Sequence, residues 1–178
     1  MAKMLVVNLF GAPGAGKSTG AAYVFSQLKM AGVNAELVTE FAKDKVWEES
    51  TEVFKNQAYI FGKQYFRISR LNDKVDVVVT DSPILLSSFY SKHDPLKTEL
   101  DVLVTKAFNL YENFNVFIER TKPYNPKGRF QNEQESDELA NELLSFLQEH
   151  DVSFECYDGS IEGYDAIVSN VLNELNLR

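Results

Sequence analysis

Short apolar runs alternate along the chain with longer stretches in which apolar residues recur every three or four positions. Five runs, rich in β-branched and aromatic side chains, each predict a buried strand. They lie at residues 5–10, 35–39, 75–80, 115–119 and 153–157. The stretches between them predict amphipathic helices that begin near residues 17, 55, 94, 137 and 161. This alternation predicts an α/β fold, in which a five-stranded parallel sheet is covered by helices on both faces.

Two local signals predict where helices begin and end. Gly32 follows the first helical stretch and is expected to end that helix as a C-cap residue. Asp94-Pro95 is expected to open another helix, with Asp94 as the N-cap and Pro95 as the first helical residue.

Composition narrows the class of protein. The 178 residues include 18 Lys and Arg against 26 Asp and Glu, so the net charge is −8, and 44% of the residues are hydrophobic. We expect one domain over residues 1–178, because the chain shows no linker or repeat. Cys156 is the single cysteine, which excludes an internal disulfide. The acidic balance argues against a surface that is basic throughout, as generic nucleic-acid binding requires.

The apolar runs also bear on membranes. The first run is far shorter than the roughly 20 residues that cross a bilayer. We therefore expect no membrane partner and a cytoplasmic localisation, in the host cytoplasm if the protein is encoded by a phage.

A phosphate-binding loop follows the first predicted strand. Residues 11–18 match the pattern G-x-x-x-x-G-K-[ST], and they lie between a predicted strand and a predicted helix, as this motif requires. Glycines let successive backbone N–H groups face one anion, and the helix N-terminus adds partial positive charge. The predicted ATP-binding residues are Gly11, Ala12, Pro13, Gly14, Ala15, Gly16, Lys17, Ser18 and Thr19. Lys17 is expected to reach the β- and γ-phosphates, and Ser18 to bind Mg²⁺. The expected fold is thus a three-layer P-loop NTPase.

Two acids follow predicted strands directly. Ligands of open parallel sheets bind beyond the carboxyl ends of the strands, so acids at those ends are candidates for function. Asp81 is predicted to bind Mg²⁺ through water in its coordination shell. The alternative is that Asp81 is the N-cap of a helix that begins near Pro83. Glu40 is predicted to accept a proton from an acceptor hydroxyl or to bind the acceptor, with a solvated loop acid as the alternative.

A basic segment stands out against the acidic chain. Residues 120–129 hold four basic residues and no acid, whereas residues 130–150 hold six acids and no Lys or Arg. We interpret residues 120–134 as a lid whose Arg120 and Arg129 neutralise charge on a transferring phosphoryl group. The alternative is a solvated loop beside an acidic helix.

Together these motifs resemble the P-loop nucleoside and nucleotide kinases, which include thymidylate, deoxynucleoside and nicotinamide riboside kinases. The matching features are the phosphate loop, Glu40, Asp81-Ser82 and the arginine-bearing lid. Residues 36–44 and 80–83 look like small phage-encoded kinases, among them the 5-hydroxymethyluracil DNA kinases. The resemblance implies ATP and Mg²⁺ as cofactors. It implies phosphoryl transfer to a nucleoside- or nucleotide-type acceptor, with 5-hydroxymethyluracil in phage DNA as the first reading. A free nucleoside or deoxynucleoside monophosphate is the alternative.

One departure from the family concerns the acceptor site. Nucleoside kinases carry Glu-Arg-Ser after the third strand, where this chain has Asp81-Ser82-Pro83 and no arginine. A substitute cation is then expected from the helix at residues 55–71. The candidates there are Arg67 and Arg70 as cations, Gln57 and Gln64 for hydrogen bonds, and Tyr59 and Phe61 for stacking. The alternative is an ordinary helix with one apolar face.

Other P-loop classes fit less well. A switch GTPase requires an Asn-Lys-x-Asp motif, which the chain lacks. AAA-type ATPases normally place a glutamate after the strand-end aspartate, where this chain has Ser82, and they add a helical domain that 178 residues barely allow. A nucleotide-binding module without catalysis stays open as a further alternative.

Overall fold

A computed structural model describes residues 3–125 and 131–176. Five parallel strands form one sheet in the order β2–β3–β1–β4–β5, which confirms the predicted α/β architecture. The strands are β1 (Leu5–Phe10), β2 (Ala35–Val38), β3 (Val77–Thr80), β4 (Glu112–Glu119) and β5 (Glu155–Asp158). β1 is central and every residue of it is buried.

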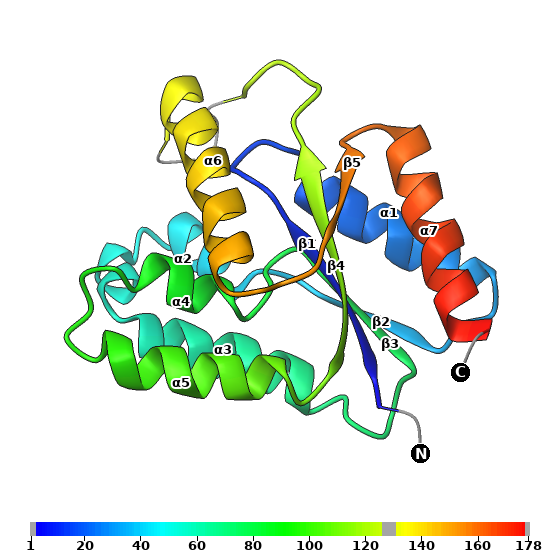
Figure 1. The fold of residues 1–178 in the computed structure, drawn as a ribbon, viewed down its shortest axis with the longest axis horizontal. Helices are drawn as coiled ribbons and strands as arrows, with labels where there is room; N and C mark the ends of the chain where they lie inside the picture. The colour runs from blue at the N-terminus through cyan, green and yellow to red at the C-terminus, as the bar shows by residue number, and fades with distance from the viewer. Residues whose placement is uncertain (1–2, 126–130, 177–178) are drawn as a thin grey trace.

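Helices cover both faces of the sheet (Figure 1). One face is covered by α1 (Lys17–Met30) and α7 (Ile161–Asn176). The other is covered by α3 (Gln57–Ser69), α4 (Leu86–Tyr90), α5 (Lys97–Phe108) and α6 (Glu133–Glu149). Alternate residues of β1 enter the two cores, because successive side chains of a strand point to opposite faces: Val7 and Leu9 face α1 and α7, whereas Val6 and Phe10 face the other layer.

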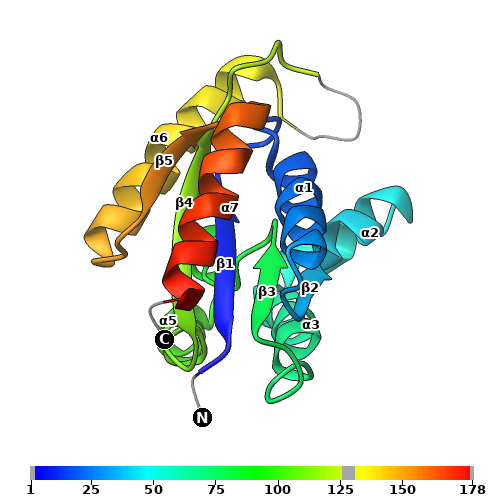
Figure 2. The ribbon, with the colours of Figure 1, turned by 90° about the vertical axis from the view of Figure 1, so that its right-hand side faces the viewer.

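The parallel strands all end toward the same end of the molecule, which is the top in Figure 2. The segments that follow β1, β2, β3 and β4 therefore meet there. These segments begin with Gly11, Thr39, Asp81 and Arg120, respectively. The topology alone thus gathers the four candidate motifs at one edge of the sheet.

Several element boundaries differ from the sequence-based expectations. The periodicity missed α4, α2 (Phe41–Trp47) and the 3₁₀ helix η1 (Thr51–Lys55) because each is too short for a repeat. Helix α6 begins at Glu133, four residues before the expected start, and a capping box of Asn132 and Glu135 fixes that start.

The prediction that Asp94 is the N-cap of a helix was wrong. Leu96 is the N-cap of α5, and Asp94 Oδ1 instead accepts from Leu96 N at 2.9 Å in the preceding turn. The prediction that Gly32 is the C-cap was wrong by one residue, because Ala31 is the C-cap of α1; Gly32 follows it with a φ of 85°, the left-handed conformation in which a glycine ends a helix. No helix within residues 3–125 and 131–176 is long and apolar enough to cross a bilayer.

Candidate active site

The loop between β1 and α1 has the backbone conformation that a phosphate cradle requires. Gly11, Gly14 and Gly16 all have positive φ, at 144°, 83° and 104°. A Cβ on Gly11 would lie 2.7 Å from the Ile118 carbonyl oxygen, and one on Gly16 would lie 2.5 Å from the Tyr164 hydroxyl. Larger residues at these two positions would therefore open the loop.

The N-terminus of α1 fits an anion. Its N-cap residue, Gly16, offers no side chain to the first-turn N–H groups, and the first turn carries no acid. Lys17 Nζ donates to Gly11 O at 2.7 Å and to Ala12 O at 3.0 Å, so the ammonium lies over the loop. The backbone donors, the helix dipole and this cation fit the phosphates of a nucleotide.

Two distant helices brace the loop. The buried Ser136, in the first turn of α6, donates from Oγ to Pro13 O at 2.7 Å. From α7, Tyr164 donates its hydroxyl hydrogen to Gly16 O at 3.0 Å. Sequence analysis missed both residues, because neither belongs to a local motif and only the fold brings them to the loop.

The Ser136 contact yields a testable prediction. Ser136→Ala leaves the Pro13 carbonyl without its buried donor, which should lower the free energy of unfolding by about 1–2 kcal/mol. It should also weaken equilibrium ATP binding several-fold, because the loop loses its brace. Urea unfolding and an ATP-binding titration measure the two effects. Ser145→Ala, an exposed serine of the same helix, is the matched control. Equal behaviour of the two variants would show that Ser136 does not brace the loop.

Three of the predicted residues from different elements meet in one cavity. Ser18, Glu40 and Asp81 all line a cavity of about 330 Å³. Glu40 N donates to Asp81 Oδ1 at 3.0 Å, which fixes the carboxylate relative to the end of β2. Asp81 Oδ2 makes no hydrogen bond within the described part of the chain, and together with the Ser18 hydroxyl it offers the oxygen ligands that Mg²⁺ prefers.

The structure gives Asp81 no role as a helix cap. Helix α4 begins at Leu86, and the N–H of Ser82 donates to Thr80 Oγ1 at 3.1 Å instead. Asp81 is only 5% exposed, so its carboxylate is held in place beside the cavity.

The carboxyl of Glu40 has a perturbed acidity. Burial raises its pKa above the ordinary glutamate value, the charge of Lys17 opposes this, and the charge of Asp81 adds to it. Tyr90, the last residue of α4, lies close enough to Glu40 for the two groups to interact electrostatically. Burial of its hydroxyl and the charge of Glu40 both raise the pKa of Tyr90, although 47% of the residue is exposed. Tyr90 is a candidate residue that sequence analysis missed, because α4 is too short to be recognised.

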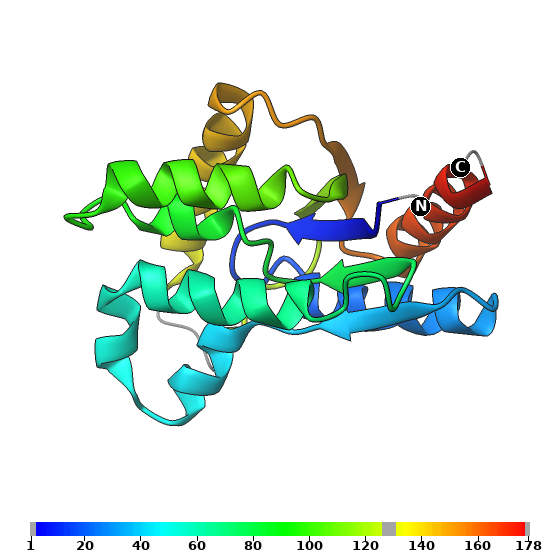
Figure 3. The ribbon, with the colours of Figure 1, turned by 90° about the horizontal axis from the view of Figure 1, so that it is seen from below.

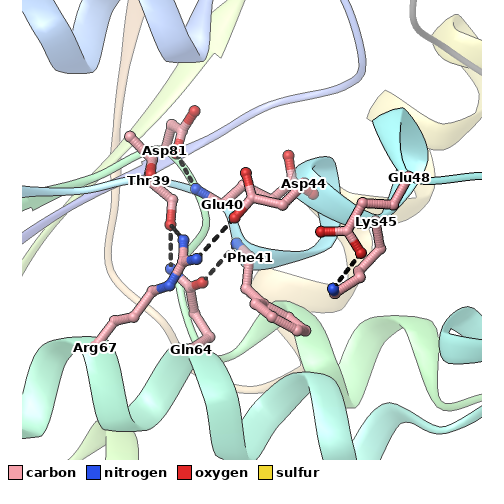
Figure 4. A network of polar contacts seen from close by, with 9 residues as sticks. All are labelled: Thr39, Glu40, Phe41, Asp44, Lys45, Glu48, Gln64, Arg67 and Asp81. Carbon is pink, nitrogen blue, oxygen red and sulfur yellow. Dashed lines mark hydrogen bonds and ion pairs between the residues drawn. The ribbon is translucent and has the colours of Figure 1, made fainter. Parts of the chain in front are cut away.

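A network of side chains fixes the backbone around Glu40 (Figure 4). Gln64 Oε1 accepts from Phe41 N at 3.0 Å, and Arg67 Nη1 donates to Thr39 O at 3.0 Å. Arg67 Nη2 also pairs with Asp44 at 2.8 Å. The peptide groups on both sides of Glu40 are therefore held by α3, while its own N–H is held by Asp81.

The predicted acceptor-binding residues of α3 are engaged with the protein itself. Gln64 is 3% exposed, and Gln57 Nε2 donates to Phe54 O at 3.3 Å. Phe61 belongs to the core, whereas Tyr59 is 44% exposed. These side chains already have intramolecular partners, so an acceptor would have to replace or share those contacts. Binding of an acceptor by Gln57, Gln64 and Arg67 stays a prediction.

The lid segment is described only in part. Arg120 Nη1 pairs with Glu133 at 2.6 Å, and Nη2 pairs with Asp137, both in the first turns of α6. These two carboxylates raise the pKa of Arg120. Arg129 lies outside the described residues.

The fold and this site define a P-loop nucleotide-binding domain. A family model described as an AAA domain matches residues 6–163, and the chain belongs to this family. The expectation that set AAA-type proteins aside because of Ser82 and chain length is wrong at the level of the family. The matched residues include the phosphate loop and four of the five strands in full. Ser82 is a single position beside Asp81, so it bears on the chemistry of the site and not on membership of the family.

Solved structures share the fold at low sequence identity. NadR protein in complex with NR has a TM-score of 0.73 and 20% identity, over 94% of this chain and 50% of that chain. This chain thus spans half the length of the NadR chain. Deoxyadenosine kinase from M. mycoides was solved with the products dCMP and dCDP, and with dATP. These structures have TM-scores of 0.56 and 0.57 and 16% identity, over 97% and 96% of this chain and 100% and 99% of theirs. No curated protein sequence matches the chain.

Proposed function

We propose that the protein is an ATP-dependent kinase that transfers the γ-phosphoryl group to a hydroxyl of a nucleoside- or nucleotide-type acceptor. The observation that carries the proposal is the cavity in which Ser18, Glu40 and Asp81 meet. It combines a phosphate loop with a second carboxyl, Glu40, which burial makes more basic than an ordinary glutamate. That is the property of a general base that accepts a hydroxyl proton.

Each residue has a distinct task in this proposal. The backbone N–H groups of the phosphate loop and Lys17 bind the β- and γ-phosphates. Ser18 and Asp81 would hold Mg²⁺, which neutralises phosphate charge when it is bound. Glu40 orients the acceptor hydroxyl and takes its proton, and Gln64 and Arg67 position Glu40 through the neighbouring peptide groups.

The acid arrangement favours a kinase over an ATPase that hydrolyses ATP. Ser82 replaces the glutamate that AAA-type ATPases normally place after the strand-end aspartate. The second carboxyl comes instead from Glu40, the N-cap residue of α2, which lies near the charge of Lys17. A carboxyl at this place suits an acceptor that enters the cavity lined by Ser18, Glu40 and Asp81.

The solved structures that share the fold support a free nucleoside or nucleotide as acceptor, in preference to a base in DNA. The test is a transfer assay with labelled ATP and separate arms for nucleosides, deoxynucleoside monophosphates and DNA containing 5-hydroxymethyluracil. A labelled nucleoside or nucleotide product supports the proposal. If only the DNA is labelled, the acceptor is a base in DNA and not a free nucleoside or nucleotide. ATP consumption without any labelled acceptor would contradict a kinase.

Arg120 provides a further prediction. In the described conformation it pairs with Glu133 and Asp137, so it must exchange these carboxylates for phosphate oxygens to act on the transferring group. Arg120→Ala should then lower turnover about a hundredfold, with much less effect on equilibrium ATP binding. Lys122→Ala, in the same segment, is the control and should stay near wild type. Near-wild-type turnover of Arg120→Ala would exclude the lid role for this residue.

A further inference from the structure

Figure 3 shows α2 and α3 beside the edge strand β2. Residues of these three elements line a second groove, of about 460 Å³. It shares the wall formed by Leu37, Thr39 and Asp44 with the cavity of the candidate active site. Neither Glu40 nor Asp81 lines it, and no residue of the phosphate loop does. Beyond this shared wall, the groove has a lining of its own, which is provided mainly by α3.

Three cations line this groove, two in α3 and one at its C-cap residue, Arg70. Lys63, Arg67 and Arg70 follow each other at intervals of four and three residues, so they share one face of the helix. The single carboxylate in the lining, Asp44, is already paired with Arg67 at 2.8 Å. Lys63 and Arg70 pair with no carboxylate of the described chain. In a protein of net charge −8, this groove is a local site of positive charge that attracts an anion.

The same groove offers an exposed aromatic surface. Phe66 lies on α3 between Lys63 and Arg70 and is 62% exposed. Leu37 and Val38 of β2 supply an apolar wall beside it. A cationic groove with an aromatic side chain suits a ligand that has both phosphate groups and a planar ring, because the ring stacks while the phosphates pair with the cations.

We propose that this groove is a second nucleotide-binding site, separate from the ATP site. The phosphate of the ligand contacts Lys63 and Arg70, and its base stacks on Phe66. A volume of about 460 Å³ falls within the usual range for a small-molecule ligand. The ligand is a phosphorylated nucleotide, either free or at the end of a single strand. This inference does not depend on the kinase activity, because none of its contacts involves the phosphate loop or Glu40.

A fluorescent reporter placed in the groove tests the proposal. Trp47 is the single tryptophan and lines the other cavity, so Trp47→Phe with Phe66→Trp moves the only indole into the groove. Thermal unfolding first establishes that this reporter protein is folded. Thymidine monophosphate should then quench its fluorescence to saturation. Thymidine, which lacks the phosphate, should bind at least about tenfold more weakly, a difference of roughly 1.4 kcal/mol.

Charge variants of the reporter protein identify the site. Lys63→Ala with Arg70→Ala should weaken the quenching at least about tenfold. The control pair, Lys29→Ala with Lys106→Ala, removes two exposed lysines elsewhere and should leave it unchanged.

Two ligand arms separate the possible sources. Saturable quenching by the monophosphate assigns the groove to free nucleotides. Quenching only by a short single-stranded oligothymidylate assigns it to the end of a strand. The proposal is overturned by absence of saturable quenching with both ligands or by equal quenching in the charge variant.

Discussion

Replacing Lys17 with alanine is expected to reduce phosphoryl transfer at least about a hundredfold while the protein stays folded. The Lys17 ammonium lies over the carbonyl oxygens of Gly11 and Ala12, where it would meet the phosphates of a bound nucleotide. One charge-assisted contact to a transferring phosphoryl group contributes about 3 kcal/mol, which corresponds to roughly a hundredfold in rate. Lys17 is only half-buried, so its removal should change the free energy of unfolding by less than about 1 kcal/mol.

Steady-state kinetics at saturating ATP and thermal unfolding measure these two effects. Lys29→Ala is the matched control, because Lys29 is an exposed lysine in the last turn of the same helix α1. The control should keep wild-type turnover. If Lys17→Ala is folded and transfers phosphate at the wild-type rate, the phosphate loop is not the catalytic site and the proposed function is wrong.

Much of the fold could be predicted from the sequence because its signals are local. The apolar run of β1 and the helical repeat of α1 are separated by a glycine-rich loop with a known conformational requirement. The alternation of strands and helices then fixes a parallel sheet with covered faces. The run at Leu5–Phe10 also contains Asn8, which is 1% exposed. Its amide is satisfied by Asn113 at 2.9 Å and Asn115 at 3.0 Å on β4, a pairing that only the strand order creates.

The candidate site was predictable where a residue follows a strand and not where it depends on tertiary contacts. Glu40 and Asp81 could be selected because both directly follow strands that the sequence predicts. The hydrogen bond from Glu40 N to Asp81 depends on the pairing of β2 with β3, which the sequence does not specify. Gln64 was selected for acceptor binding because it is polar, but its position in α3 buries it against the end of β2. Polarity alone could not distinguish these two roles.

The raised pKa of Glu40 predicts how turnover depends on pH. Burial favours the protonated carboxyl, so the base form develops at a pH above the ordinary glutamate pKa of about 4.3. Turnover should therefore fall on the acid side of a midpoint that lies above this value. Glu40→Gln should remove that acid limb and lower turnover by about 10²–10⁴-fold, with little change in ATP affinity. Glu36→Gln, an exposed glutamate of the same strand β2, is the matched control.

Asp81→Asn separates the two acids of the site. Asparagine can still accept the hydrogen bond from Glu40 N, but it provides no charge for Mg²⁺. We therefore expect Asp81→Asn to raise the Mg²⁺ concentration needed for half-maximal turnover. Glu40→Gln should leave that requirement unchanged. Identical responses of the two variants across a Mg²⁺ titration would contradict this division of roles.

The same pKa shift means that ionised Glu40 lowers the free energy of unfolding at neutral and higher pH. This effect distinguishes a functional residue from one that stabilises the fold. A carboxyl whose pKa is raised in the folded state contributes stability below its unfolded pKa, and this contribution is lost as the pH rises through the folded pKa. At pH 8, Glu40→Gln should therefore be at least as resistant to unfolding as the wild type, and this advantage should shrink at low pH. Urea unfolding at pH 8 and pH 4 measures both values. A variant that loses turnover together with stability at pH 8 would assign Glu40 a structural role instead of a catalytic one.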